Sequence, residues 1–218
     1  MTDTAREYLN KERYTVNDLL DIMKFLRVGC PWDKEQTHES IRQNFIEEVY
    51  EVCDAIDKKD PELMCEELGD VMLQVVFHAQ MAQEKGEFTF EDAVDGICRK
   101  LVLRHPHVFG DVNADTTKEV LTNWDKIKQD TKGQKSVKDT LEDVPNALPA
   151  LMRAQKIAKR ASKGEYTLNN SYADYKKEEA KLRIGKELFD LCSAAQACGI
   201  DAEEALFEYS TDFVSKFE

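Results

Sequence analysis

Four carboxylates at a repeated interval are the residues of this 218-residue chain best placed to do chemistry. Glu48 and Glu51 are three residues apart, and Glu67 and Asp70 repeat that interval on the next predicted helix. Residues three apart in an α-helix lie on one side, about one turn from each other. Two such pairs on facing helices would offer four hard oxygen donors, which suit Mg²⁺ or Mn²⁺. The spacing therefore predicts a divalent-cation site.

The second of these helices gives the stronger indication, because polar residues interrupt a nearly continuous apolar surface. Residues 71–82 are apolar on almost every side, which predicts a buried central helix. Four polar residues nevertheless share one stripe about 80° wide at the helical period, namely Glu67, Asp70, Gln74 and His78. An unpaired buried carboxylate is costly, and no Lys or Arg lies on this stripe. We therefore expect a bound cation to neutralise it.

Other interpretations of these residues stay open on sequence alone. Glu48 and Glu51, taken by themselves, could form an ordinary solvated helix face. A carboxylate-bridged di-iron site would need a Glu-x-x-His motif on each of two helices, and the chain has one, formed by Glu35 and His38. His78 could contact a substrate or be an interior hydrogen-bonded histidine. The remaining histidines, which are His38, His105 and His107, are predicted to be packing or surface residues.

Helical periodicity dominates the chain and no alternating strand pattern is present, so we predict an all-α helical bundle. The helix of Glu48 is expected over residues 39–57 with Thr37 as its N-cap. The helix of Asp70 is expected over residues 62–85 with Gly86 as its stop. Further helices are expected over 15–27, 90–104, 117–130, 149–161, 173–199 and 202–217, with a linker over 131–139.

Composition narrows the class of protein. The net charge of −13 argues against a main role in binding a nucleic-acid backbone, which calls for clustered Lys and Arg. The longest apolar stretch, 71–82, is too short to span a bilayer, and no signal peptide is visible, so we expect a cytoplasmic protein with no membrane partner. The six cysteines form no C-x-x-C pair and are predicted to be buried free thiols.

Motifs around the carboxylates resemble one family. The segments 47–51 (EEVYE) and 67–70 (ELGD) match the E-E-x-x-E and E-x-x-D pattern of the all-α nucleoside triphosphate pyrophosphohydrolases. Three more segments, CPWDKEQT at 30–37, EELGD at 66–70 and RHPHVFGD at 104–111, resemble MazG-type enzymes. The close resemblance covers about residues 14–132. It implies hydrolysis of nucleoside triphosphates to the monophosphate and pyrophosphate, with Mg²⁺ as cofactor and Mn²⁺ as a possible substitute.

The resemblance also implies roles for particular residues. The four carboxylates Glu48, Glu51, Glu67 and Asp70 match the family's metal ligands, and Glu47 and Glu66 are candidates for activating water or supporting the ligands. Basic and aromatic residues match positions expected to contact substrate: Lys100, Arg104, Trp124 and Lys128. Trp32 joins Trp124 as a candidate for stacking on the base. Without the resemblance, compensation of a helix dipole would be the favoured explanation of Lys100 and Arg104.

Residues 134–218 resemble a shortened second MazG-like copy. This interpretation divides the chain into a catalytic domain, 1–133, and a structural one, 134–218. The positions that match Glu67 and Asp70 in the second copy hold Arg183 and Lys186, which cannot bind a cation.

The family builds its helical bundle from two protomers, so we expect a homodimer. We also expect activity on several triphosphates, because phosphates and metals are shared by all of them. The alternative function is a non-catalytic regulatory module that binds a nucleotide or a protein partner.

Overall fold

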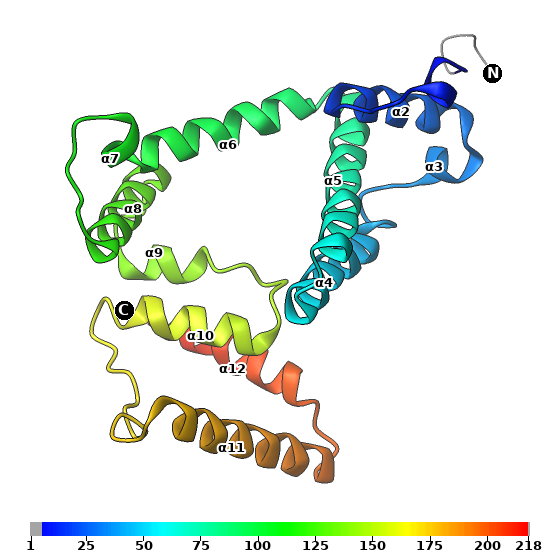
Figure 1. The fold of residues 1–218 in the computed structure, drawn as a ribbon. Coiled ribbons are helices and arrows are strands. Elements are labelled where there is room, and N and C mark those ends of the chain that lie inside the picture. Colours follow the sequence, from blue (N-terminus) through cyan, green and yellow to red (C-terminus); the bar gives the residue numbers. More distant parts are fainter. Residues whose placement is uncertain (1–5, 218) are drawn as a thin grey trace. The chain divides into compact units, whose positions relative to one another are not determined.

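The computed structural model describes residues 6–217, and every regular element among them is a helix (Figure 1). The predicted all-α fold is therefore confirmed. The chain forms two compact units, Met1–Leu103 and Arg104–Glu218. This division reflects packing and does not coincide with the boundary predicted between residues 133 and 134. That boundary separates two sequence copies and stays a prediction. No helix in the described part of the chain is long and apolar enough to cross a membrane.

The first unit is built around a helical hairpin. It contains η1 (Glu7–Asn10), α2 (Val16–Gly29), α3 (Pro31–Glu35), α4 (Arg42–Lys58), α5 (Pro61–Glu84) and nearly all of α6 (Phe90–Arg104). The chain turns between α4 and α5 at Lys59, which adopts a left-handed conformation with φ of 57°. Asp60 then caps α5, because its side chain accepts hydrogen bonds from two backbone N–H groups at the helix start. Helices α4 and α5 consequently lie side by side (Figure 1).

Apolar burial holds α5 against α2 and the start of α4. The core of this unit consists of Met23, Ile41, Val76, Phe77 and Met81. Removing such side chains from water is the main favourable term in folding. The helix ends where Gly86 takes a positive φ of 71° and the N–H of Glu87 bonds to the carbonyl of Ala82 at 3.0 Å. The predicted stop at Gly86 is confirmed.

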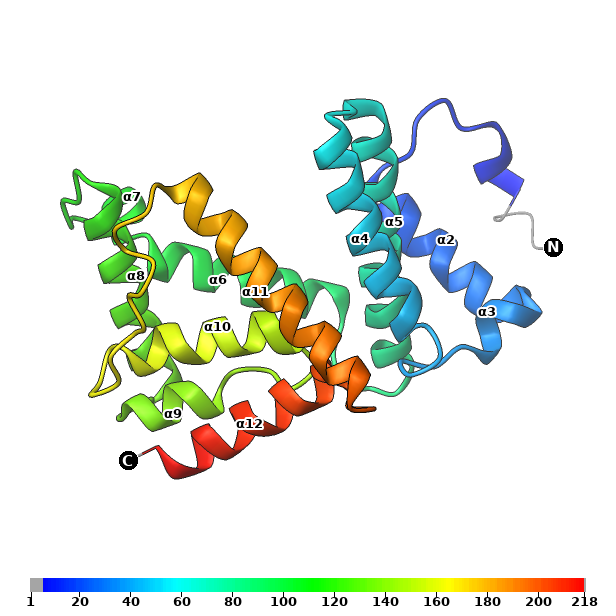
Figure 2. The ribbon, with the colours of Figure 1, turned by 90° about the horizontal axis from the view of Figure 1, so that it is seen from below.

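The second unit packs three helices around its own core. It contains α7 (Pro106–Phe109), α8 (Thr117–Lys132), α9 (Val137–Glu142), α10 (Ala150–Ala161), α11 (Lys177–Ala197) and α12 (Ala202–Lys216). Figure 2 shows α10 beside α9 and α12. The buried apolar residues are Leu141, Val144, Ile157, Ala161 and Val214. Helices α8 and α9 each begin with a capping box.

Several local predictions are wrong. Helix α4 begins at Arg42, because Thr37 forms a turn with Ser40 instead of capping a helix. The predicted linker over 131–139 contains the end of α8 and the start of α9. The short helices α3 and α7 were not predicted, because each is too short for its apolar period to show.

The cysteines were also predicted wrongly. Five of the six are exposed and Cys30 is half-buried, although all six are free thiols as predicted. Cys53, Cys65, Cys98 and Cys192 lie on exposed sides of helices, whereas Cys30 and Cys198 follow the ends of α2 and α11. Helical periodicity shows that a face is apolar, but it does not show which element covers that face.

Candidate functional site

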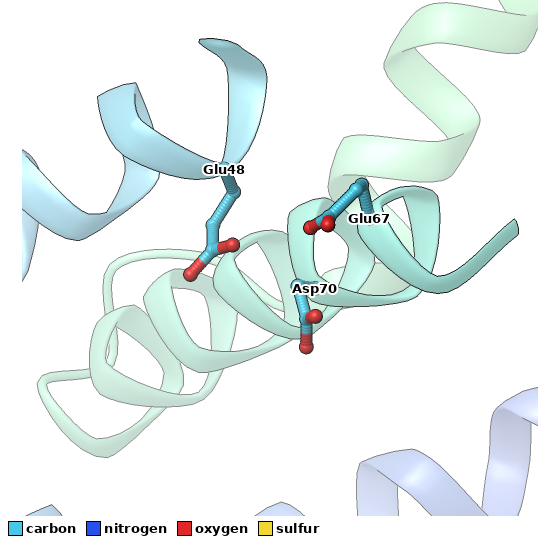
Figure 3. A group of neighbouring side chains, drawn as sticks. All are labelled: Glu48, Glu67 and Asp70. Atoms are coloured by element: carbon cyan, nitrogen blue, oxygen red, sulfur yellow. The ribbon is translucent and has the colours of Figure 1, made fainter. Parts of the chain in front are cut away.

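Three carboxylates from α4 and α5 meet in the first unit. Glu48 on α4 and Glu67 and Asp70 on α5 each present one oxygen, and these oxygens lie within 4.8 Å of one another (Figure 3). All three side chains are half-buried. The hairpin turn brings the two helices together, and the interval of three residues places Glu67 and Asp70 on the side of α5 that faces Glu48. This is the group of carboxylates for which the spacing predicted a cation site.

The negative charges of the three carboxylates repel one another when no cation is bound among them. Burial, followed by the negative charge of Asp70, raises the pKa of Glu48. Burial, followed by the charges of Glu51 and Glu66, raises the pKa of Glu67. None of the three clustered carboxylates forms an ion pair with Lys or Arg in the described part of the chain. A divalent cation with oxygen preference would relieve this repulsion, so the donor set fits Mg²⁺ or Mn²⁺.

The other predicted acidic residues lie around this cluster at different distances. Glu51 is exposed and is not one of the three whose oxygens meet, yet its charge reaches both Glu48 and Glu67. Glu66 is exposed and acts on Glu67 through its charge. Glu47 is exposed on α4. Glu51 and Glu66 therefore add negative charge around the cluster without being part of it.

Three of the predicted substrate-contacting residues gather in the second unit. The guanidinium of Arg104 lies 5.4 Å from the ring centroid of Trp124, in cation–π geometry. Lys128 is half-buried, and burial together with the positive charge of Arg160 lowers its pKa. The Arg104 Nε is buried without a hydrogen-bond partner among residues 6–217. The resulting basic and aromatic group has the chemistry needed to hold phosphate oxygens.

The two remaining predicted substrate contacts belong to the first unit. Lys100 is exposed on α6. Trp32 lies on α3 and is 57% exposed, with its ring packed edge-on against Phe77 at 6.4 Å between centroids. Because Phe77 belongs to the core, α3 holds the indole against α5 while leaving most of it accessible. Trp32 therefore remains available for stacking.

A histidine pair was missed by the sequence analysis. His38, in the loop before α4, stacks on His78 of α5 with the rings 5.1 Å apart and 7° from parallel. Their Nδ1 atoms are 2.8 Å apart, so one ring donates a hydrogen bond to the other. His78 is therefore hydrogen-bonded, and whether it also contacts a substrate stays a prediction. His38 gave no sequence signal, since the two residues are separated by 40 positions.

Helix α11 presents charges of the opposite kind. Arg183 pairs with Glu179 at 3.0 Å and Lys186 pairs with Asp190 at 2.5 Å, each along the exposed surface of the helix. These cations occupy the positions that the sequence matched to Glu67 and Asp70. Within the described residues, the one carboxylate group with metal-binding geometry is that of α4 and α5.

Comparisons with known proteins agree with this geometry. A family model described as the MazG nucleotide pyrophosphohydrolase domain matches residues 36–109, the segment that contains the cluster. The chain is 43% identical to the nucleoside triphosphate pyrophosphohydrolase of Escherichia coli (strain K12), over 93% of this chain and 85% of that protein. It is 39% identical to the nucleoside triphosphate pyrophosphohydrolase/pyrophosphatase MazG of Thermotoga maritima, over 92% of this chain and 83% of that protein.

A solved structure of a MazG-related protein from Thermotoga maritima also matches, at 27% identity and a TM-score of 0.47, over 52% of this chain and 99% of that chain. The two full-length relatives decide the assignment, because the identity extends through both compact units. The family resemblance inferred from the motifs is confirmed. The chain belongs to the MazG family of nucleotide pyrophosphohydrolases.

Proposed function

We propose that the protein is a Mg²⁺-dependent enzyme that hydrolyses nucleoside triphosphates to the monophosphate and pyrophosphate. The observation that supports this most strongly is the half-buried cluster of Glu48, Glu67 and Asp70, which has three converging carboxylates and no cationic partner in the described chain. The proposed reaction is the one for which the relatives in Escherichia coli and Thermotoga maritima are named. Mn²⁺ could substitute, because it accepts the same oxygen donors.

Each group of residues has a task in this proposal. Glu48, Glu67 and Asp70 hold the cation, with Glu51 close enough to join them. When bound, the metal neutralises triphosphate charge and lowers the pKa of a water. We assign proton acceptance to Glu66 before Glu47, because the charge of Glu66 already reaches the cluster.

The phosphate chain needs cationic donors in addition to the metal. In the second unit, Arg104 and Lys128 are predicted candidates for contacting phosphate, and Trp124 holds the Arg104 guanidinium in cation–π contact. Lys100, exposed on α6, is a further candidate. Because these groups would recognise phosphates, which every triphosphate shares, we infer activity on several nucleotides.

The first experiment is product analysis on the eight common triphosphates with Mg²⁺ and with excess chelator. We expect pyrophosphate and the monophosphate with Mg²⁺, and no turnover with chelator. Release of orthophosphate alone would contradict the reaction. Nucleotide binding without turnover would support the alternative function, a regulatory module.

We also infer that two copies assemble into a homodimer. Apolar side chains on α4 and α5 are exposed in the single chain, namely Ile46, Val49, Tyr50, Leu68, Met72 and Val75. An uncovered apolar face of this kind is typical of an interface between protein chains. Sedimentation at micromolar concentration tests this inference, and a single species of 25.0 kDa would contradict it.

A further inference from the structure

The polar stripe of α5 continues beyond the carboxylate cluster. Asp70, Gln74 and His78 are four residues apart, so each lies about 6 Å further along the same side of the helix. Gln74 is only 7% exposed, and its Oε1 has no hydrogen-bond partner among residues 6–217. The Nε2 of His78 is also buried and unpartnered within that range. Two adjacent turns of one stripe therefore hold polar atoms that nothing in the described chain satisfies.

This stripe faces α4, as the contacts at its two ends show. At one end Asp70 meets Glu48 in the carboxylate cluster. At the other end His78 contacts the ring of Phe45, with 5.6 Å between ring centroids. Gln74 lies between these two levels of α5, on the same side. Its amide is consequently placed between the cation site and the histidine pair.

The contact with His38 fixes the orientation of the His78 ring and leaves only its Nε2 atom for another partner. Its Nδ1 is engaged by His38 at 2.8 Å, and the parallel stacking of the rings prevents the imidazole from turning freely. The Nε2 atom, on the other side of the ring, is left for another partner. When Nδ1 donates to His38, Nε2 is an acceptor, and when Nδ1 accepts, Nε2 is a donor.

Buried polar atoms without partners destabilise a fold, and in native proteins they are uncommon enough to require an explanation. Here both atoms continue the line that starts at the cation cluster. Trp32 of α3 packs its largely exposed ring edge-on against Phe77 of α5, the residue before His78. A flat ring beside hydrogen-bonding groups is the chemistry that recognises a nucleobase.

We infer that Gln74 and His78 form hydrogen bonds with the base edge of the nucleotide whose triphosphate lies at the carboxylate cluster. This inference rests on the proposed function and adds the residues that set its substrate preference. Gln74 Oε1 accepts an N–H from the base, and His78 Nε2 adds a second contact. A base that cannot engage both atoms leaves one of them unpaired, so the expected discrimination is graded.

The test compares kcat/KM across the eight common triphosphates for the wild type, Gln74→Leu and His78→Phe. The matched control is Gln83→Leu, the same change at an exposed position of α5. For Gln74→Leu we expect about a tenfold loss on the preferred bases, equivalent to about 1.4 kcal/mol, and little change on the others. The control should keep the wild-type order of preference.

A second measurement separates this inference from a packing role. Calorimetric Kd values for the nucleoside monophosphates should show the same loss of base preference, without requiring turnover. Thermal unfolding reports whether each variant folds. If Gln74→Leu does not fold, the His78→Phe variant provides the test. Three results would each overturn the inference. The ratios of kcat/KM between bases could stay unchanged, kcat/KM could fall equally on all eight triphosphates, or the change could be confined to the preference between ribose and deoxyribose. Absence of turnover in the wild type with intact base-dependent binding would overturn the proposed reaction alone.

Discussion

Helices α5 and α11, of 24 and 21 residues, differ in whether their charged side chains are neutralised within the chain. On α5, Glu67 and Asp70 are half-buried beside a third carboxylate, and no cation of the described chain neutralises them. On α11, Arg183 and Lys186 each pair with an acid four residues away on the exposed surface of the helix. Exposed pairs of this kind contribute little to stability. Unneutralised acids in a hairpin instead indicate a ligand that the chain itself does not provide.

The largest expected effect is on turnover. Asp70→Asn keeps the shape of the side chain but removes a charge from the cation site, so we expect at least a loss of about a hundredfold in kcat. The matched control on α11 is Asp190→Asn, which breaks only an exposed ion pair with Lys186. Pyrophosphate release at saturating Mg²⁺ measures both. Equal activity of the two variants would remove the functional distinction between the helices.

The response of thermal unfolding to Mg²⁺ is the next largest effect. A concentration of about a hundred times Kd stabilises a protein by about 2.7 kcal/mol, which is about 5–10 °C in Tm for a chain of this size. We expect that shift in the wild type and in Asp190→Asn, and none in Asp70→Asn. Without metal, Asp70→Asn should have a higher Tm than the wild type, because the charge of Asp70 acts against Glu48. A Tm of Asp70→Asn that follows Mg²⁺ like the wild type would place the cation elsewhere.

The carboxylate cluster of Glu48, Glu67 and Asp70 could be predicted from sequence, because it depends mainly on the helical period. Glu67 and Asp70 share a side of α5 wherever that helix packs, and the apolar residues around them indicated partial burial. The contact of His38 with His78 could not be predicted, because it depends on the path of the loop before α4.

The extent of burial could not be predicted from sequence either. Helix α5 is buried on several sides only from Gln74 onward, while Leu68, Met72 and Val75 stay exposed in the single chain. Periodicity identifies an apolar side of a helix, but the neighbour that covers it is set by tertiary packing or by assembly.

A smaller effect is expected at Arg104, the first residue of the second unit, which can be compared with Arg99 of the first unit. Arg104 stacks on Trp124, whereas Arg99 on α6 pairs with Asp95 in solvent. Charge-assisted hydrogen bonds contribute about 1.5–3 kcal/mol each, so Arg104→Gln should lower kcat/KM by about ten- to a hundredfold. Arg99→Gln should leave it unchanged. Quenching of Trp124 fluorescence by added pyrophosphate gives a binding readout for the same variants.

The outcome for Arg104 also tests the assignment of phosphate contacts. If Arg104→Gln and Arg99→Gln behave alike, Arg104 is a packing residue of the second unit. Lys128→Gln then becomes the decisive variant, since the pKa of that lysine is lowered by burial and by nearby positive charges. A bound phosphate would reverse this effect and raise the pKa of Lys128.

The smallest expected effect is the pH dependence of stability in the metal-free protein. Burial and the charges of Glu51 and Glu66 raise the pKa of Glu67 above its unfolded value of about 4.3. The folded state therefore binds this proton more tightly than the unfolded state. Stability from this group is present below pH of about 4.3 and is lost as the pH rises through the raised pKa.

Replacing the ionisable group should abolish that loss. Glu67→Gln should raise the Tm of the metal-free protein at neutral pH, and the gain should vanish as the pH falls below the unfolded pKa. Glu179→Gln, which removes an exposed partner of Arg183 on α11, should show no such gain. Saturating Mg²⁺ should reverse the order at neutral pH, because the wild type then gains binding energy that Glu67→Gln has lost. A Tm difference that is independent of both pH and Mg²⁺ would show that Glu67 acts through packing alone.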